Sequence, residues 1–156
     1  MKRLILHELK ADLLQVMVST SGSQLLPQEA IKEVREQLLP MATILTPNVP
    51  EAILLLADAG MEVQEPKSVD GLIELAKTLQ SLGPEYVVLK GGHLPFRRDG
   101  TVACEEHEKE LVVDILCGAG VIERIETVYQ NSKNTHGTGC SLACKFKSAC
   151  ILLLCI

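Results

Sequence analysis

The stretch NTHGTGC, residues 134–140, combines two glycines with a cysteine at the point where a helical pattern begins. Glycines leave backbone N–H groups open, and such groups at a helix N-terminus can hold an anion. Gly137, Thr138 and Gly139 could surround the oxygens of a transferring phosphoryl group. The same helix end would lower the thiol pKa of Cys140, which could then accept a proton from an attacking hydroxyl. The alternative is a capped, glycine-rich helix start with a buried cysteine, and two glycines do not decide between the two.

Asn48 and Glu51 stand three residues apart at the start of another helical stretch. An amide and a carboxylate in that position can face one solvent pocket and order water around Mg²⁺, which takes oxygen ligands and keeps several waters. The alternative is helix capping by Asn48, with Glu51 favourable in the first turn. The spacing is compatible with both interpretations.

Lys90 follows a continuous apolar run in the segment VLKGGH, residues 88–93. A lysine at a strand end can neutralise negative charge on a phosphate during transfer. Gly91 and Gly92 would let the backbone approach a ligand closely, whereas the alternative is an ordinary turn with a solvated lysine. Asp114 alternates with apolar neighbours in VVDIL, so it is either exposed or directed at a ligand.

These candidates must be positioned by strands and helices that alternate along the chain. The apolar patterns predict strands over 16–22, 42–48 and 86–92 and helices over 27–39, 50–60 and 68–83. From 95 to 130 the pattern predicts strands in TVACEE, KELVVDIL and VIERIETV, joined by polar turns as antiparallel pairs, before a return to helix after 140. This order is α/β, with a mostly parallel sheet covered by helices. Ligands of such sheets bind at the carboxyl ends of the strands, where the candidate residues fall.

The composition of the 156 residues predicts one globular domain, because 47% are hydrophobic and 22% are charged. A net charge of −5 without a cluster of basic residues argues against a nucleic-acid partner. The N-terminus lacks the pattern of a signal peptide, and the apolar C-terminal run is too short to cross a bilayer, so no membrane partner is expected. Six cysteines without a CxxC pair predict reduced, mostly buried thiols in a cytoplasmic protein.

The order of four segments along the chain is characteristic: TPNVPEA (46–52), VVLKGGH (87–93), VVDIL (112–116) and NTHGTGCSLA (134–143). This order resembles the hydroxymethylpyrimidine and phosphomethylpyrimidine kinases of thiamine biosynthesis, a branch of the ribokinase-like superfamily, and the likeness runs over about residues 16–143. It implies a single, partial kinase domain over 1–156 with an incomplete three-layer α/β/α fold. It also implies an enzyme that uses ATP and Mg²⁺ to phosphorylate hydroxymethylpyrimidine and its monophosphate.

The resemblance also implies roles for individual residues. For catalysis these are Cys140 as the base, the anion-hole residues Gly137, Thr138 and Gly139, and Lys90 beside the phosphates. For nucleotide binding they are Lys90, Asn48, Glu51, Thr135, Gly137 and Gly139. Magnesium is implied at Glu51 and Asn48, through water.

The two ends of the chain depart from the family pattern. The family's glycine-rich N-terminal part is not found, residues 1–15 look unrelated to it, and the segment from 144 to 156 replaces its alanine-rich helix. We therefore expect a chain truncated at the N-terminus and altered at the C-terminus, lacking most of the pocket for the alcohol. Two alternatives follow: an inactive fragment that binds nucleotide or a full-length partner, and a pyridoxal (vitamin B6) kinase. A homo-oligomer is also compatible with the sequence.

Overall fold

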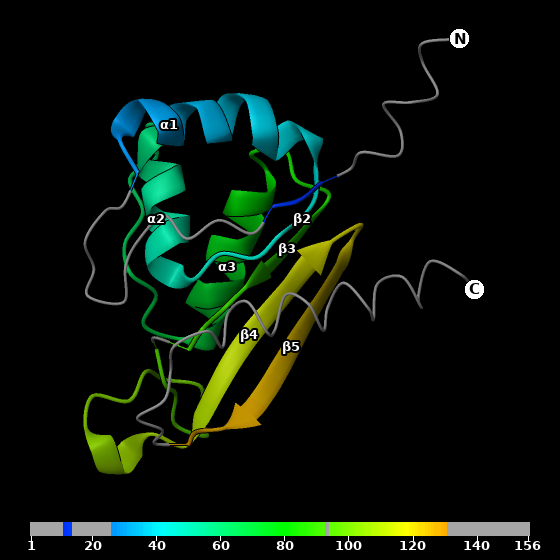
Figure 1. Ribbon diagram of the computed structural model, residues 1–156. Coiled ribbons are helices and arrows are strands. Elements are labelled where there is room, and N and C mark those ends of the chain that lie inside the picture. Colours follow the sequence, from blue (N-terminus) through cyan, green and yellow to red (C-terminus); the bar gives the residue numbers. More distant parts are fainter. Residues whose placement is uncertain (1–10, 14–25, 93, 131–156) are drawn as a thin grey trace, which may run out of the picture.

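The computed structural model describes residues 11–13, 26–92 and 94–130 (Figure 1). The helices are α1 (Gln28–Glu33), α2 (Val49–Asp58) and α3 (Val69–Gln80), and the strands are β1 (Ala11–Leu13), β2 (Ala42–Leu45), β3 (Tyr86–Leu89), β4 (Leu111–Gly118) and β5 (Val121–Val128). α1 continues through a wider π-helical turn, Val34–Leu38, into a 3₁₀ turn, Leu39–Met41. No helix among these residues is both long enough and apolar enough to cross a membrane.

The five strands form one sheet in the order β1-β2-β3-β4-β5. β1, β2 and β3 run parallel, whereas β3, β4 and β5 pair antiparallel. The α/β class is confirmed, and the sheet is mixed because β4 runs antiparallel to β3, after which a tight turn returns the chain into β5. The predicted strand over 16–22 lies outside the described residues, whereas β1 falls where the sequence predicted no element.

The helical predictions for α2 and α3 are confirmed, and each helix has a clear physical start. Asn48 caps α2 and Ser68 caps α3, where the Ser68 hydroxyl accepts the N–H of Gly71 at 3.2 Å. α2 stops before Gly60, whose φ of +78° is unfavourable for residues with a side chain. Their apolar positions recur at helical spacing, so each helix buries one face.

The core lies between the three helices and one face of the sheet (Figure 1). It is aliphatic apart from Phe96 and Cys117, and its fully buried members include Ile31 of α1, Leu55 of α2 and Leu72 of α3. β3 is central and buried, as its continuous apolar run predicted. Of the three expected layers, the described residues thus contain the sheet and one helical layer.

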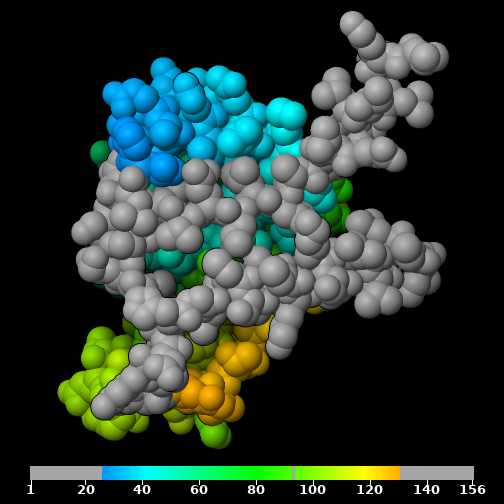
Figure 2. All heavy atoms as spheres, viewed as in Figure 1, coloured from blue at the N-terminus to red at the C-terminus, as the bar shows by residue number. Residues whose placement is uncertain are grey.

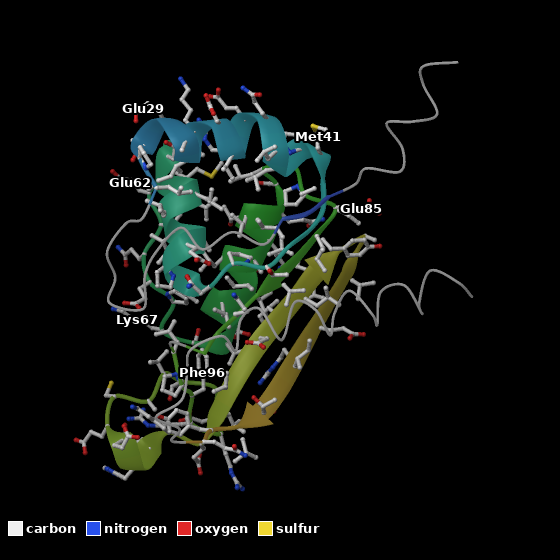
Figure 3. The ribbon with its side chains drawn as sticks, in the orientation of Figure 1. Glu29, Met41, Glu62, Lys67, Glu85 and Phe96 are labelled. Carbon is white, nitrogen blue, oxygen red and sulfur yellow. The ribbon has the colours of Figure 1, made fainter. Side chains whose placement is uncertain are left out.

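The segment between β3 and β4 differs from the prediction. TVACEE does not form a strand: Thr101 and Val102 make only isolated bridges, to Ser68 and Phe96, and a 3₁₀ turn follows over Glu106–Glu108. Phe96 holds this segment in place, because it is fully buried and exchanges backbone hydrogen bonds of 2.7 and 2.9 Å with Leu111 at the start of β4. Figure 3 places Phe96 at the end of the sheet remote from Met41.

The predicted antiparallel pairing of β4 and β5 is confirmed over all eight residues of each strand. A two-residue turn, Ala119 and Gly120, joins them, and both residues have positive φ values, 48° and 77°. β5 lies at one edge of the described sheet, and its side chains lie at the surface, where Figure 2 colours them orange. Its exposed apolar residues are Val121, Ile122 and Val128.

Candidate functional site

The carboxyl ends of β2 and β3 bring three of the predicted residues together. Asn48 and Lys90 form a parallel backbone bridge just beyond the two strands. The N–H of Lys90 donates to the carbonyl of Pro47 at 2.8 Å. Because β2 and β3 are parallel neighbours, the segments that follow them leave the same edge of the sheet, and Glu51 follows on the first turn of α2.

Asn48 and Glu51 form a reciprocal capping box at the start of α2. The Asn48 side-chain oxygen accepts the N–H of Glu51 at 2.8 Å, and a Glu51 carboxylate oxygen accepts the N–H of Asn48 at 2.9 Å. The capping alternative is therefore confirmed. The expected shared solvent pocket is not found for Glu51, since only 2% of this residue is exposed.

This geometry does not fit direct coordination of a magnesium ion. One oxygen of each side chain is already engaged with the backbone, and Glu51 is buried. Across the residues that the structure describes, no group of three His, Cys, Asp or Glu side chains could hold a metal ion. Mg²⁺ is often held by one or two carboxylates together with substrate phosphates, so only a contact through water remains compatible with the pair.

The two glycines after Lys90 have different surroundings. A Cβ atom on Gly91 would lie 2.0 Å from the carbonyl oxygen of Val113 and 3.3 Å from a methyl carbon of Leu72, so Gly91 packs against β4 instead of opening toward a ligand. Gly92 is exposed, and a Cβ atom there would meet nothing within 4 Å. Gly92 is thus the glycine at which a ligand could approach the backbone.

Asp114 of β4 is directed at the same turn. Its carboxylate oxygen accepts the N–H of Gly91 at 2.9 Å. Partial burial raises the pKa of Asp114 above its ordinary value, and the Gly91 hydrogen bond and the Lys90 charge oppose that rise. Alternation in VVDIL placed Asp114 on the opposite face from Val113 and Ile115, but the partner of its carboxylate could not be read from spacing.

Thr46 was not singled out by the sequence, although it directly precedes Pro47. Its hydroxyl oxygen is buried and has no hydrogen-bond partner in the described part of the chain. A buried hydroxyl with unused hydrogen-bonding capacity is uncommon, and here it lies at the carboxyl end of β2. The only signal in the sequence was that Thr46 is the first residue of the TPNVPEA segment.

The remaining predicted site residues lie outside the described residues: Thr135, Gly137, Thr138, Gly139 and Cys140. Their roles stay predictions.

Of the two cysteines described, both are free thiols, and they differ in exposure. Cys117 is buried, as expected for most of the thiols, and burial raises its thiol pKa, whereas Cys104 is exposed. Neither lies in the cluster around Lys90.

Comparison with known proteins gives the family of this chain. A sequence model described as phosphomethylpyrimidine kinase matches residues 10–152. A hydroxymethylpyrimidine/phosphomethylpyrimidine kinase of Bacillus subtilis is 34% identical over 82% of this chain and 41% of its own length. A pyridoxine kinase of the same organism is 38% identical over the same shares of the two chains.

The fold agrees with these matches. The crystal structure of an ADP complex of Bacillus subtilis pyridoxal kinase superposes with a TM-score of 0.60 at 34% identity, covering 83% of this chain and 42% of that one. The chain thus spans about two fifths of the length of these relatives. The match over residues 10–152, most of the 156-residue chain, shows that it belongs to the phosphomethylpyrimidine kinase family.

Proposed function

We propose that this chain takes part in the ATP-dependent phosphorylation of hydroxymethylpyrimidine and of its monophosphate. The observation that carries the proposal is the pairing of Asn48 with Lys90 at the carboxyl ends of two parallel strands. That edge is where α/β sheets bind their ligands, and a lysine there can balance phosphate charge. Membership of the family supports the choice of reaction.

In this proposal the chain's own residues position the phosphates and move one proton. Lys90 faces the phosphate groups of ATP, and Gly92 allows their close approach. The amides of Gly137, Thr138 and Gly139 stabilise the transferring phosphoryl group. Cys140 accepts the proton of the attacking hydroxyl as a new oxygen–phosphorus bond forms and ADP leaves.

Asn48 and Glu51 have a supporting part in the same proposal. Their capping box fixes the start of α2 beside Lys90, which keeps the helix N-terminus at the phosphate side of the site. A magnesium ion carried by the phosphates would meet these two side chains only through water. Thr135 completes the expected nucleotide contacts.

Steady-state turnover of hydroxymethylpyrimidine with ATP tests the proposal. Lys90→Ala is expected to lower kcat/KM by about 100-fold, the scale of losing one charge-stabilising group at a transition state. Lys32→Ala is the matched control, because Lys32 is an exposed lysine on α1 and its loss changes the net charge equally. Equal activity of the two variants would remove Lys90 from the reaction.

Cys140→Ala separates binding from transfer. We expect this variant to bind ADP as the parent does and to lose pyrimidine-dependent turnover, because only the proton acceptor is removed. If the parent chain binds ADP but shows no turnover with any alcohol, nucleotide binding alone would be its function.

A second candidate function is the phosphorylation of pyridoxal or pyridoxine. The observation that favours it is the pyridoxine kinase relative, whose identity of 38% exceeds that of the pyrimidine kinase relative. Side-by-side kcat/KM values for hydroxymethylpyrimidine and pyridoxal would decide between the two, and a tenfold preference for pyridoxal would favour the second.

A further inference from the structure

The turn after β3 is held at each of its first two backbone amides. The N–H of Lys90 donates to the Pro47 carbonyl at 2.8 Å, which ties the turn to the segment before α2. The N–H of Gly91 donates to the Asp114 carboxylate at 2.9 Å, which ties it to β4. The Gly91 carbonyl in turn accepts the N–H of Leu94 at 2.8 Å. Of these three contacts, only the one with Asp114 uses a side chain.

Asp114 stands out among the residues of β4. Its neighbours Val113 and Ile115 are fully buried in the core, and across the sheet it pairs with Ile125 of β5. A half-buried carboxylate in an apolar strand lowers stability unless its charge is balanced or hydrogen-bonded. The partners found for it are the Gly91 amide and the Lys90 charge, and both belong to the turn.

We propose that Asp114 is a positioning residue, which fixes the turn over 90–92 through the Gly91 amide so that Lys90 and Gly92 face the phosphates of a bound nucleotide. Gly91 cannot shift toward β4 because the Val113 carbonyl blocks it, and the Asp114 hydrogen bond keeps it from moving away. The nucleotide part of this inference rests on the proposed function.

Two variants of the 156-residue chain separate the hydrogen bond from the charge. Asp114→Asn keeps an oxygen that can accept the Gly91 N–H and loses the negative charge, whereas Asp114→Ala loses both. For each variant, NMR gives the hydrogen-exchange rate of the Gly91 amide, and calorimetric titration with ADP and Mg²⁺ gives the Kd.

In Asp114→Ala, we expect Gly91 exchange and the Kd for ADP each to rise by about tenfold, the scale of one lost hydrogen bond to a charged group. In Asp114→Asn, both values are expected to stay within about threefold of the parent, since the acceptor remains. A general loss of folding would change both values in both variants. Near-parental values in Asp114→Asn would therefore show that the change in Asp114→Ala comes from the lost hydrogen bond. The exchange rate of the Leu55 amide, in the core of α2, checks that the fold is intact.

The outcomes distinguish this inference from the proposed function. An unchanged Gly91 exchange rate in Asp114→Ala would overturn the positioning role. Faster exchange with an unchanged Kd would also overturn it, because the contact would then have no effect on the nucleotide. If the parent shows a protected, Asp114-dependent Gly91 amide and binds no ADP, the contact is supported and the proposed function fails.

Discussion

Gly91 is the residue at which the turn after β3 comes closest to its neighbouring strand. The 2.0 Å between its ideal Cβ position and the Val113 carbonyl oxygen is far inside van der Waals contact. The obstacle is backbone of the central sheet, which cannot rotate away as a flexible side chain could. The next residue, Gly92, has open space around its own ideal Cβ position. The two neighbouring glycines can therefore be compared directly, because only one of them is crowded.

Gly91→Ala is therefore expected to lower the free energy of unfolding by about 2–4 kcal/mol, through overpacking and the loss of nearby hydrogen bonds. Gly92→Ala is the control and is expected to change it by less than about 1 kcal/mol. Urea unfolding followed by circular dichroism measures both. Equal losses in the two variants would contradict the close approach.

The raised pKa of Asp114 makes a pH-dependent prediction. Because burial raises the pKa in the folded state, the stability that this group contributes is fully present below the ordinary Asp pKa, about 3.9, and is lost as pH rises through the raised value. Asp114→Asn does not titrate, so the free energy of unfolding of the variant minus that of the parent should increase between pH 3.5 and pH 7. A difference that is constant over this range would show that the folded and unfolded pKa values are equal.

For single residues, the sequence predicted which residues belong to the candidate site better than it predicted the contacts that they make. Asn48 and Lys90 were expected at one edge of the sheet and lie there, because strand order decides which segments meet. The burial of Glu51 could not be predicted, since the same spacing serves a capping box and a solvent-facing pair. The partner of Asp114 depends on the Gly91 backbone, which alternation along β4 does not reveal.

Among the elements, α2 depends most on its first turn. Two backbone N–H groups are satisfied there by the capping box, and the helix begins next to Lys90. Asn48→Ala is expected to lower the free energy of unfolding by about 1–2 kcal/mol, the upper part of the range for a lost N-cap. Asn48→Asp keeps the acceptor and should stay within about 0.5 kcal/mol of the parent. Thermal unfolding at fixed pH compares them, and an equal loss in both variants would argue against the cap.

The turn of the β4–β5 hairpin carries a residue that is not optimal for it. Ala119 has a φ of 48°, a region where an Ala side chain is unfavourable and where Asn or Gly is preferred before the Gly120 that follows. Ala119→Asn is therefore expected to raise the free energy of unfolding by about 0.5–1 kcal/mol. Gly120→Ala, at a φ of 77° in open space, should lower it by a similar amount. A loss of stability in Ala119→Asn, measured by urea titration, would contradict this reasoning.

Elements with strong local signals were predicted, and those that depend on distant partners were not. α2, α3 and β3 carry caps, glycine stops or a continuous apolar run, so their positions follow from their own residues. The segment around Thr101 has the composition of a strand. Within the described part of the chain it lacks a partner strand, however, because Ser68 and Phe96 each offer it only an isolated bridge.

At the scale of the whole molecule, the described residues share one largely aliphatic cluster, to which α1, α2, α3, β2, β3 and β4 all contribute. A shared core predicts that these elements unfold together. Tyr86 at the start of β3 pairs with Gly118 at the turn end of the hairpin, Tyr129 follows β5 at its open end, and the chain has no Trp. We expect urea transitions from tyrosine fluorescence and from far-ultraviolet circular dichroism to share one midpoint. Two separate midpoints would show that the hairpin and the helical side are independent units.

The overall architecture was predictable only in part. Alternating helices and strands indicated the α/β class, and the polar interruptions after residue 95 indicated antiparallel pairs. The parallel pairing of β1 with β2 was not expected, because Ala11–Leu13 is too short to show a period of two.

The tight turn at Ala119 and Gly120 also bears on the order in which the chain folds. β4 and β5 pair residues that are close in sequence, so this hairpin can close on a timescale of about 1–10 μs. β1 and β2 are far apart in the sequence, and the entropy of closing so long a loop delays their contact. The hairpin is then the expected nucleus of folding, and the parallel side of the sheet would assemble on it.

On this basis the stabilisation from Ala119→Asn should accelerate refolding and leave the unfolding rate unchanged. Stopped-flow experiments measure both rates. A slower unfolding rate would place hairpin formation after the rate-limiting step.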